Sequence, residues 1–269
     1  MVIEDAATVS GRTVRYLTGG AGWPVVLLHA FPLSADMWRA QLDVAPDGFQ
    51  LIAPDLRGFG QSVAPAPHAA PTMDDFAGDV EGLLNILEIE RAVIGGMSMG
   101  GYVTFALFRR APDRFSGMVL ADTRAQADTP EGRQARRAMS ELVRAKGPSA
   151  VADQMIPKLL GRTTREERPS VAGEVRRLIL ANDAGGIDGG IHAMMTRPDS
   201  TPDLARISTP ALVVVGEEDE LTPVADSEAM HASIGRSRLV VLPRAGHLSG
   251  VELPEEFSRA LGDFLTSNL

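Results

Sequence analysis

"GGMSMGG", residues 95–101, places one serine between two methionines and two pairs of glycines. The apolar run 92–95 leads into it, and a segment with helical spacing follows. Residues 96–100 match G-x-S-x-G, the pattern of a sharp strand-to-helix turn that displays a serine hydroxyl. The glycines let strand and helix approach each other without a Cβ clash, and a helix N-terminus favours negative charge. The stretch therefore predicts a nucleophile at Ser98, with an ordinary structural turn as the alternative.

Short apolar runs alternate with helical patterns along most of the chain. Each run is followed by Pro, Gly or Asp, as is typical of buried strands in a parallel sheet; the runs are 25–28, 50–53, 92–95, 118–121, 211–216 and 239–242. Helical spacing occurs at 71–87, 102–110 and 254–265. Strands alternating with helices predict a doubly wound, mostly parallel α/β sheet. Residues 2–9 and 12–18 alternate more regularly and predict an antiparallel edge hairpin.

One long segment interrupts this alternation. The 89 residues between the runs ending at Ala121 and beginning at Ala211 far exceed the dozen or so that a crossover needs. Helix starts are predicted at Thr129 and, from a capping-box pattern, at Thr164. We therefore expect a helical lid over 123–205, inserted into an α/β core formed by 1–122 and 206–269. Residues 124–199 hold 13 Lys or Arg and 10 Asp or Glu, a net charge of +3, within a chain of net charge −9.

Composition excludes several classes of protein and site. The 269 residues include no cysteine, which rules out disulfides and thiolate metal sites, and we expect neither a metal nor another cofactor. A net charge of −9 disfavours a nucleic-acid partner, and no apolar run approaches the length of a membrane span. The acidic start "MVIEDAATVS" does not resemble a secretory signal, so we expect a cytoplasmic protein. The sequence does not indicate an oligomeric state.

A serine nucleophile needs a base, and the chain offers five histidines. His247 lies in a glycine-flanked loop directly after the last apolar run, in the order Ser, acid, His, and is the predicted base. His29 ends a strand and is expected to form structural hydrogen bonds. His68 and His231 are expected to be solvated, and His192 to pack within the predicted lid, with a place in the pocket lining as the alternative.

Four consecutive carboxylates, residues 217–220, follow the penultimate apolar run. The spacing G-x-x-D, with Thr222-Pro223 at a helix start, favours Asp219 as the acid that orients the imidazole. Asp122, at the end of the run before the predicted lid, is the reserve candidate.

The remaining requirements are an oxyanion hole and a pocket. Backbone N–H groups of Met99, next to the nucleophile, and of Phe31, in the loop "HAFPLSADMW", are the predicted donors. Five apolar side chains are expected to line the substrate pocket, with core packing as the alternative for each: Trp38, Met97, Tyr102, Met194 and Met195.

Taken together, "LLHAFP", "PDLRGFGQS", "GGMSMGG", "VVVGEEDELTP" and "AGHLS" resemble the α/β-hydrolase superfamily, in order and over nearly the whole chain. The resemblance implies the α/β-hydrolase fold and a serine hydrolase that cleaves a carboxylic ester or lactone of a small, largely apolar substrate through an acyl-enzyme. One departure is Ala30, where the family's His-Gly-aromatic-Pro has glycine.

Several branches of the superfamily stay open. "HAFPLSADMW" with "MSMGG" is similar to cofactor-free haloperoxidases and arylesterases, where a proline at the position of Pro32 implies perhydrolase activity. The Ser-Met-Gly-Gly step and the predicted lid also resemble carbon–carbon bond hydrolases and 3-oxoadipate enol-lactonases. The alternatives outside enzymes are a ligand receptor on a hydrolase scaffold and a non-catalytic interaction protein.

Overall fold

The computed structural model describes residues 1–62 and 70–269, and within these ranges eight strands form one sheet in the order β1-β2-β4-β3-β5-β6-β7-β8. Strands β3 to β8 pair in parallel, whereas β1 pairs with β2, and β2 with β4, in antiparallel fashion. The prediction of a mostly parallel sheet with an N-terminal edge hairpin is confirmed. The strands are β1 Ile3–Val9, β2 Arg12–Gly20, β3 Trp23–Leu28, β4 Phe49–Pro54, β5 Ala92–Met97, β6 Phe115–Ala121, β7 Ala211–Gly216 and β8 Ser237–Leu242.

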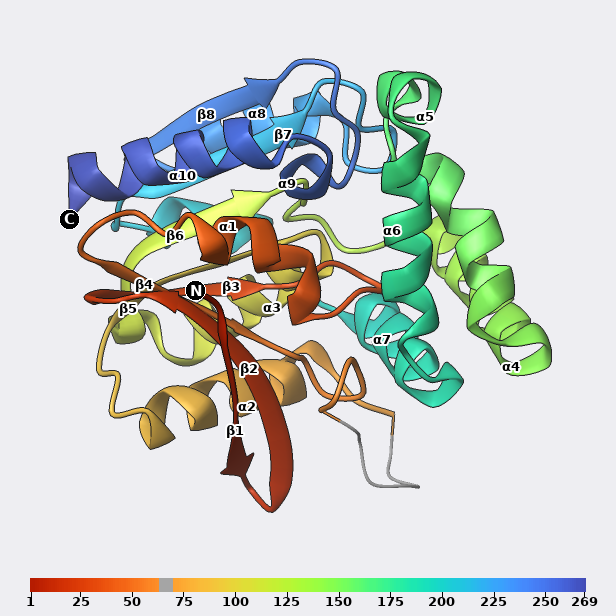
Figure 1. Ribbon diagram of the computed structural model, residues 1–269, viewed down its shortest axis with the longest axis horizontal. Coiled ribbons are helices and arrows are strands. Elements are labelled where there is room, and N and C mark those ends of the chain that lie inside the picture. Colours follow the sequence, from red (N-terminus) through yellow and green to blue (C-terminus); the bar gives the residue numbers. More distant parts are fainter. Residues whose placement is uncertain (63–69) are drawn as a thin grey trace.

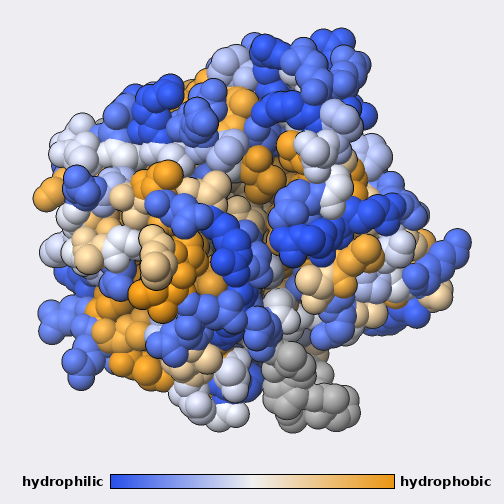
Figure 2. Space-filling model, viewed as in Figure 1, coloured by the Kyte–Doolittle hydropathy of each residue, from blue (hydrophilic) through white to orange (hydrophobic). Residues whose placement is uncertain are grey.

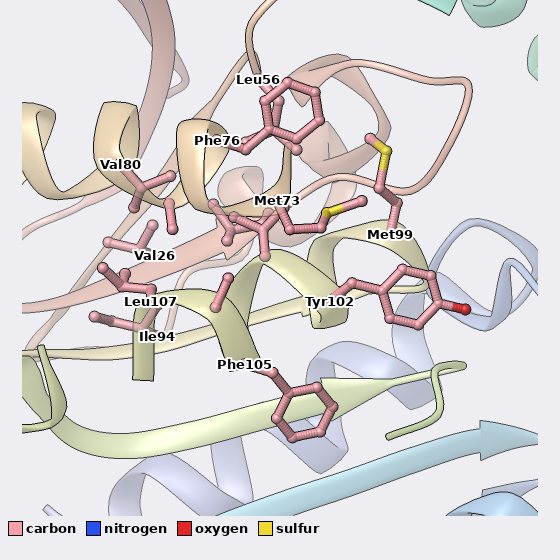
Figure 3. Packing of buried hydrophobic residues seen from close by; sticks show 14 of the residues in the cluster. Val26, Leu56, Met73, Phe76, Val80, Ile94, Met99, Tyr102, Phe105 and Leu107 are labelled. Carbon is pink, nitrogen blue, oxygen red and sulfur yellow. The ribbon is translucent and has the colours of Figure 1, made fainter. Parts of the chain in front are cut away.

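Helices cover both faces of this sheet because alternate residues of its strands point to opposite sides (Figure 1). Val26 and Leu28 of β3 pack with α2 (Met73–Ile86) and α3 (Met99–Arg110), and Figure 3 shows side chains of these elements meeting. Val25 and Leu27 pack on the other face. The helices on that face are α1 (Arg39–Asp43) and α10 (Pro254–Asn268), and α8 (Val224–Ser233) contributes to the first face. Three 3₁₀ turns, Ala35–Trp38, Pro112–Arg114 and Thr201–Arg206, and the short α9 (Ser249–Glu252) complete the fold.

Four helices lie between β6 and β7 and gather at one end of the sheet (Figure 1). They are α4 Pro130–Leu159, α5 Arg162–Glu167, α6 Pro169–Leu180 and α7 Ala184–Thr196, and we refer to residues 130–196 as the insertion. The predicted start at Thr129 is correct, since its side chain accepts a hydrogen bond from the Gly132 amide at 3.1 Å. Helix α4 bends at Gly147, whose φ of +73° interrupts the helix.

The predicted helix start at Thr164 is wrong. Thr164 lies inside α5, where its hydroxyl is buried and accepts a hydrogen bond from Arg168 at 2.8 Å. The amide at the start of α5 belongs to Thr163 and donates to the Glu218 carboxylate at 2.8 Å. A distant side chain therefore satisfies the helix terminus, and the local capping pattern is not used.

The outer surface in the view of Figure 2 is hydrophilic over α5 and α6, whereas hydrophobic residues gather over the core on the left. No helix within the described ranges combines the length and apolar character that a membrane crossing requires.

Candidate active site

Ser98 occupies a strained turn between β5 and α3. Its backbone has φ 54° and ψ −112°, a conformation that L-residues adopt only where the surroundings enforce it. A Cβ on Gly100 would lie 2.2 Å from the Leu28 carbonyl oxygen, and one on Gly96 would lie 2.6 Å from the Gly100 carbonyl carbon. The glycines of "GGMSMGG" therefore allow the helix to approach the strands closely enough for the turn to form. Thr123 fixes the turn further, because its hydroxyl donates to the Ser98 carbonyl at 2.8 Å.

A chain of hydrogen bonds links Ser98, His247 and Asp219. The Ser98 hydroxyl donates to His247 Nε2 at 2.8 Å, and His247 Nδ1 donates to Asp219 Oδ2 at 2.8 Å. The three side chains come from the segments that follow β5, β8 and β7, so the carboxyl ends of three parallel strands bring them together. This geometry is the one in which a base takes the proton of a serine while an acid holds the imidazole in the right tautomer.

Asp219 is held as a carboxylate by its surroundings. Its Oδ1 accepts hydrogen bonds from the Leu221 and Thr222 amides at 2.8 and 2.9 Å, and its Oδ2 accepts one from the Thr222 hydroxyl at 2.5 Å. Burial raises the pKa of Asp219, but attraction to His247 and these hydrogen bonds outweigh burial and lower that pKa below the usual range of aspartate.

Asp122, the reserve acid, forms no hydrogen bond with His247 in the structure. Its Oδ1 accepts from the Gly216 amide at 2.9 Å, and its Oδ2 forms a 2.5 Å hydrogen bond with the Ser249 hydroxyl. The carboxyl therefore ties the end of β6 to the end of β7 and to the segment after His247. Burial, followed by repulsion from Asp219, raises the pKa of Asp122 well above the usual range, because the hydrogen bonds from Ser249 and Gly216 offset burial only in part.

This raised pKa predicts how the effect of Asp122→Asn depends on pH. When folding raises the pKa of a carboxyl, the folded protein becomes less stable as the pH rises from the usual aspartate range through the raised pKa. Asparagine is neutral throughout and keeps a similar shape. The melting temperature of Asp122→Asn relative to the wild type should therefore increase between pH 4 and pH 8, the span over which an ordinary aspartate (pKa about 3.9) goes from about half ionised to fully ionised. Thermal unfolding at several pH values measures this difference, and a difference that stays constant or decreases contradicts it.

Two backbone amides have no acceptor within the described residues: that of Met99, which follows Ser98 in the chain, and that of Phe31, which lines a cavity with Ser98. Within the described residues, neither the Phe31 nor the Met99 N–H donates a hydrogen bond. Unpaired amides in a buried region are rare, and a pair of them beside a serine matches the donors that an oxyanion requires. Ala30, the departure from the family pattern, is not among the described residues with positive φ, so its methyl group causes no backbone strain.

Among the other histidines that the structure describes, none forms a hydrogen bond with Ser98. His29 is fully buried; its Nε2 accepts from the Leu56 amide at 3.0 Å and its Nδ1 donates to the Ala30 carbonyl at 3.0 Å. Burial lowers the pKa of His29, which keeps it neutral in this structural role. His231 bonds to Ser237, and His192 lies 3.2 Å from the Pro71 carbonyl. His68 falls outside the described residues.

A cavity of about 140 Å³ opens onto Ser98 and His247, and we call it the inner cavity. Tyr102 and Met194, two of the predicted pocket residues, line it together with Phe31. The other lining residues are Arg124, Arg136, Met155, Leu159, Leu221 and Thr222.

Three predicted pocket residues lie elsewhere, and these expectations are corrected. Trp38 and Met97 are fully buried in the core on the α1 and α10 face, where Trp38 packs against Phe257 with ring centroids 5.5 Å apart. Met195 lines a separate surface hollow with His192. Residue type alone could not separate these apolar side chains, because core and pocket use the same ones.

Several residues of the site were missed. Arg136 and Met155 belong to the insertion, and only its docking brings them to the cavity at Ser98, whereas Arg124 follows the end of β6, the neighbour of β5. Glu252 was also missed; its fully buried carboxylate accepts from the Gly246 amide, next to His247, and from the Gly161 amide of the insertion, both at 2.9 Å. No local pattern marks such long-range contacts.

Comparison with known proteins agrees with the fold. The family model described as "alpha/beta hydrolase fold" matches residues 24–253, and the chain belongs to this family. It is 31% identical to 3-oxoadipate enol-lactonase 2 of Acinetobacter baylyi over 261 residues, 96% of this chain and 95% of that one. A thermophilic esterase from Thermogutta terrifontis, solved with malate bound, is 40% identical, with a TM-score of 0.93 over 98% of both chains. The enol-lactonase from Burkholderia xenovorans LB400 is 30% identical, with a TM-score of 0.88 over 97% of this chain and 100% of that chain.

Proposed function

We propose that the protein hydrolyses carboxylic esters or lactones through an acyl-enzyme formed on Ser98. The esterase and enol-lactonase relatives support ester or lactone hydrolysis in general. The observation that carries the finer proposal is the hydrogen-bond chain from Ser98 through His247 to Asp219, at 2.8 Å in both steps.

In the first step, Ser98 Oγ attacks the carbonyl carbon and passes its proton to His247 Nε2. The Phe31 and Met99 amides donate to the oxygen that becomes negative. When the intermediate collapses, the bond to the alcohol oxygen breaks and His247 returns the proton to that oxygen. Asp219 stabilises the imidazolium while it exists.

In the second step, water attacks the acyl carbon and gives a proton to His247. The bond to Ser98 Oγ then breaks, the serine recovers the proton, and the carboxylic acid leaves. With a lactone, the alcohol and the acid are two ends of one product. The apolar part of the inner cavity, formed by Met155, Leu159, Met194 and Leu221, would hold the acyl chain.

The direct test is a set of 4-nitrophenyl esters and simple lactones assayed with the wild type. We expect repeated turnover of at least one ester or lactone, which also separates an enzyme from a ligand receptor, because a receptor would stop after a single turnover. Adding hydrogen peroxide as an alternative acceptor measures peracid formation and thereby tests perhydrolase activity. Absence of turnover on every ester and lactone would overturn the proposed function.

A further inference from the structure

We propose that the substrate carries a free carboxylate, which Arg124 binds inside the catalytic cavity with Arg136 adding positive charge. The favoured substrates are then half-esters or lactones of dicarboxylic acids. This inference rests on the proposed ester or lactone hydrolysis and adds the class of acid that is cleaved.

The charge of the inner cavity supports this. Its lining residues include two arginines, Arg124 and Arg136, and neither aspartate nor glutamate. A second cavity of about 280 Å³, the outer cavity, shares Phe31, Tyr102 and both arginines with the inner one. It adds Lys158 as a third cation and Asp128 as its one carboxylate, so its lining is net positive. The protein as a whole has a net charge of −9, so the positive charge is local to the cavities.

Arg124 has unused hydrogen-bonding capacity. Its nearest charged partner is Asp226, with Nε 3.6 Å from Oδ2, which is too long for a hydrogen bond. Within the described residues the Arg124 side chain donates no hydrogen bond, and 35% of it is exposed. A cavity-lining arginine whose planar fork of N–H donors lacks an acceptor suits a carboxylate, which accepts two parallel hydrogen bonds from such a fork.

Arg136 contributes charge that its neighbours do not fully cancel. Asp128 pairs with Arg136 and also with Arg197, whose Nη1 lies 2.7 Å from Asp128 Oδ1. Two guanidinium groups thus share a single carboxylate, and one positive charge is left over. Arg197 is 5% exposed and stacks over the Tyr102 ring at 4.0 Å, so the cluster is fixed against the cavity wall.

Two other basic side chains of the insertion, Arg144 and Arg177, do not share this arrangement. Arg144 pairs with Asp188 at 2.7 Å, Arg177 pairs with Glu174 at 2.6 Å, and both lie on the exposed surface. The positive charge of residues 124–199 is therefore not only that of an exposed helix face, because part of it is directed into the cavities.

The test compares two esters that differ only in charge. One is mono-4-nitrophenyl glutarate, which has a free carboxylate, and the other is its methyl ester, in which that carboxylate is masked. The succinate and adipate pairs vary the distance between the carboxylate and the reacting carbonyl. Rates are corrected for uncatalysed hydrolysis.

We expect the wild type to prefer the free carboxylate by about 10- to 100-fold in kcat/KM, the range that hydrogen bonds to a charged group supply. Arg124→Gln should remove this preference, because it lowers kcat/KM for the free carboxylate far more than kcat/KM for the masked ester. Arg124→Lys keeps the charge without the fork and should retain part of the preference. The matched control is Lys146→Gln, which removes one exposed positive charge from α4 outside both cavities and should keep the full preference.

Two outcomes overturn the inference while leaving ester hydrolysis intact. In one, the wild type cleaves the masked ester as well as the charged ester at every chain length. In the other, Arg124→Gln lowers both rates equally. If the wild type cleaves neither ester, the panel of esters and lactones above tests the proposed function separately. The carboxylate site is then tested by calorimetry of Ser98→Ala with monomethyl glutarate and with uncharged dimethyl glutarate. If Ser98→Ala binds monomethyl glutarate more tightly than dimethyl glutarate, and the added Arg124→Gln substitution abolishes this difference, the carboxylate site is supported. Equal binding of the two compounds, or no binding of either, overturns it.

Discussion

Ser98→Ala should lower kcat for esters by about 10⁶-fold, the loss seen when a serine nucleophile is removed from a comparable set of residues. The geometry of the site explains why the expected decrease in kcat is so large. Without Oγ no acyl-enzyme forms, and His247 and the Phe31 and Met99 amides can only assist direct attack by water. The smaller side chain should not disturb the turn, because the turn depends on Gly96 and Gly100.

Ser116→Ala is the matched control. Ser116 is also 8% exposed, as Ser98 is, but it lies in β6 and accepts a hydrogen bond from the Trp23 indole at 3.1 Å. Its replacement should change kcat by no more than about twofold. Steady-state kinetics with one activated ester measures both variants. Substantial activity in Ser98→Ala would show that the hydroxyl is not the nucleophile.

Asp219→Asn should lower kcat by about 10⁴-fold, while the fold is retained. Asparagine cannot accept the His247 Nδ1–H through a charged oxygen, so the imidazole loses both its tautomer and the stabilisation of its cation. Asp122→Asn should reduce kcat far less, because the Asp122 carboxyl forms hydrogen bonds with Gly216 and Ser249 and none with His247.

The comparison of these two variants assigns the acid. Circular dichroism on both confirms that loss of activity is not loss of folding. A larger decrease in Asp122→Asn than in Asp219→Asn would exchange their roles and make Asp122 the orienting acid.

The fold was predictable because its signals are local and repeated. Six apolar runs, each ended by a turn residue, predicted the parallel strands, and regular alternation predicted the hairpin of β1 and β2. The proximity of Ser98, Asp219 and His247 followed from the same source, since each residue comes shortly after a parallel strand. Their roles in catalysis stay predictions, which the variants above test.

The pocket was less predictable because residue type does not say which side a side chain faces. Met97 and Met99 flank the same serine, yet Met97 packs with Trp38 in one cluster and Met99 lies in the other. The arginines that line the cavity could not be predicted from the sequence, for a different reason. Arg124 follows β6, the neighbour of β5 in the sheet, whereas Arg136 reaches the cavity only because α4 docks on the core.

The most direct test of the central claim is covalent labelling of Ser98. The protein is treated with an organophosphate such as diisopropyl fluorophosphate, and the product is analysed by intact mass and by peptide mapping. We predict one phosphoryl group per chain, located on Ser98, with loss of activity in parallel and no label on Ser98→Ala. A wild type that stays unlabelled and active, or that carries its label on another residue, would contradict the account.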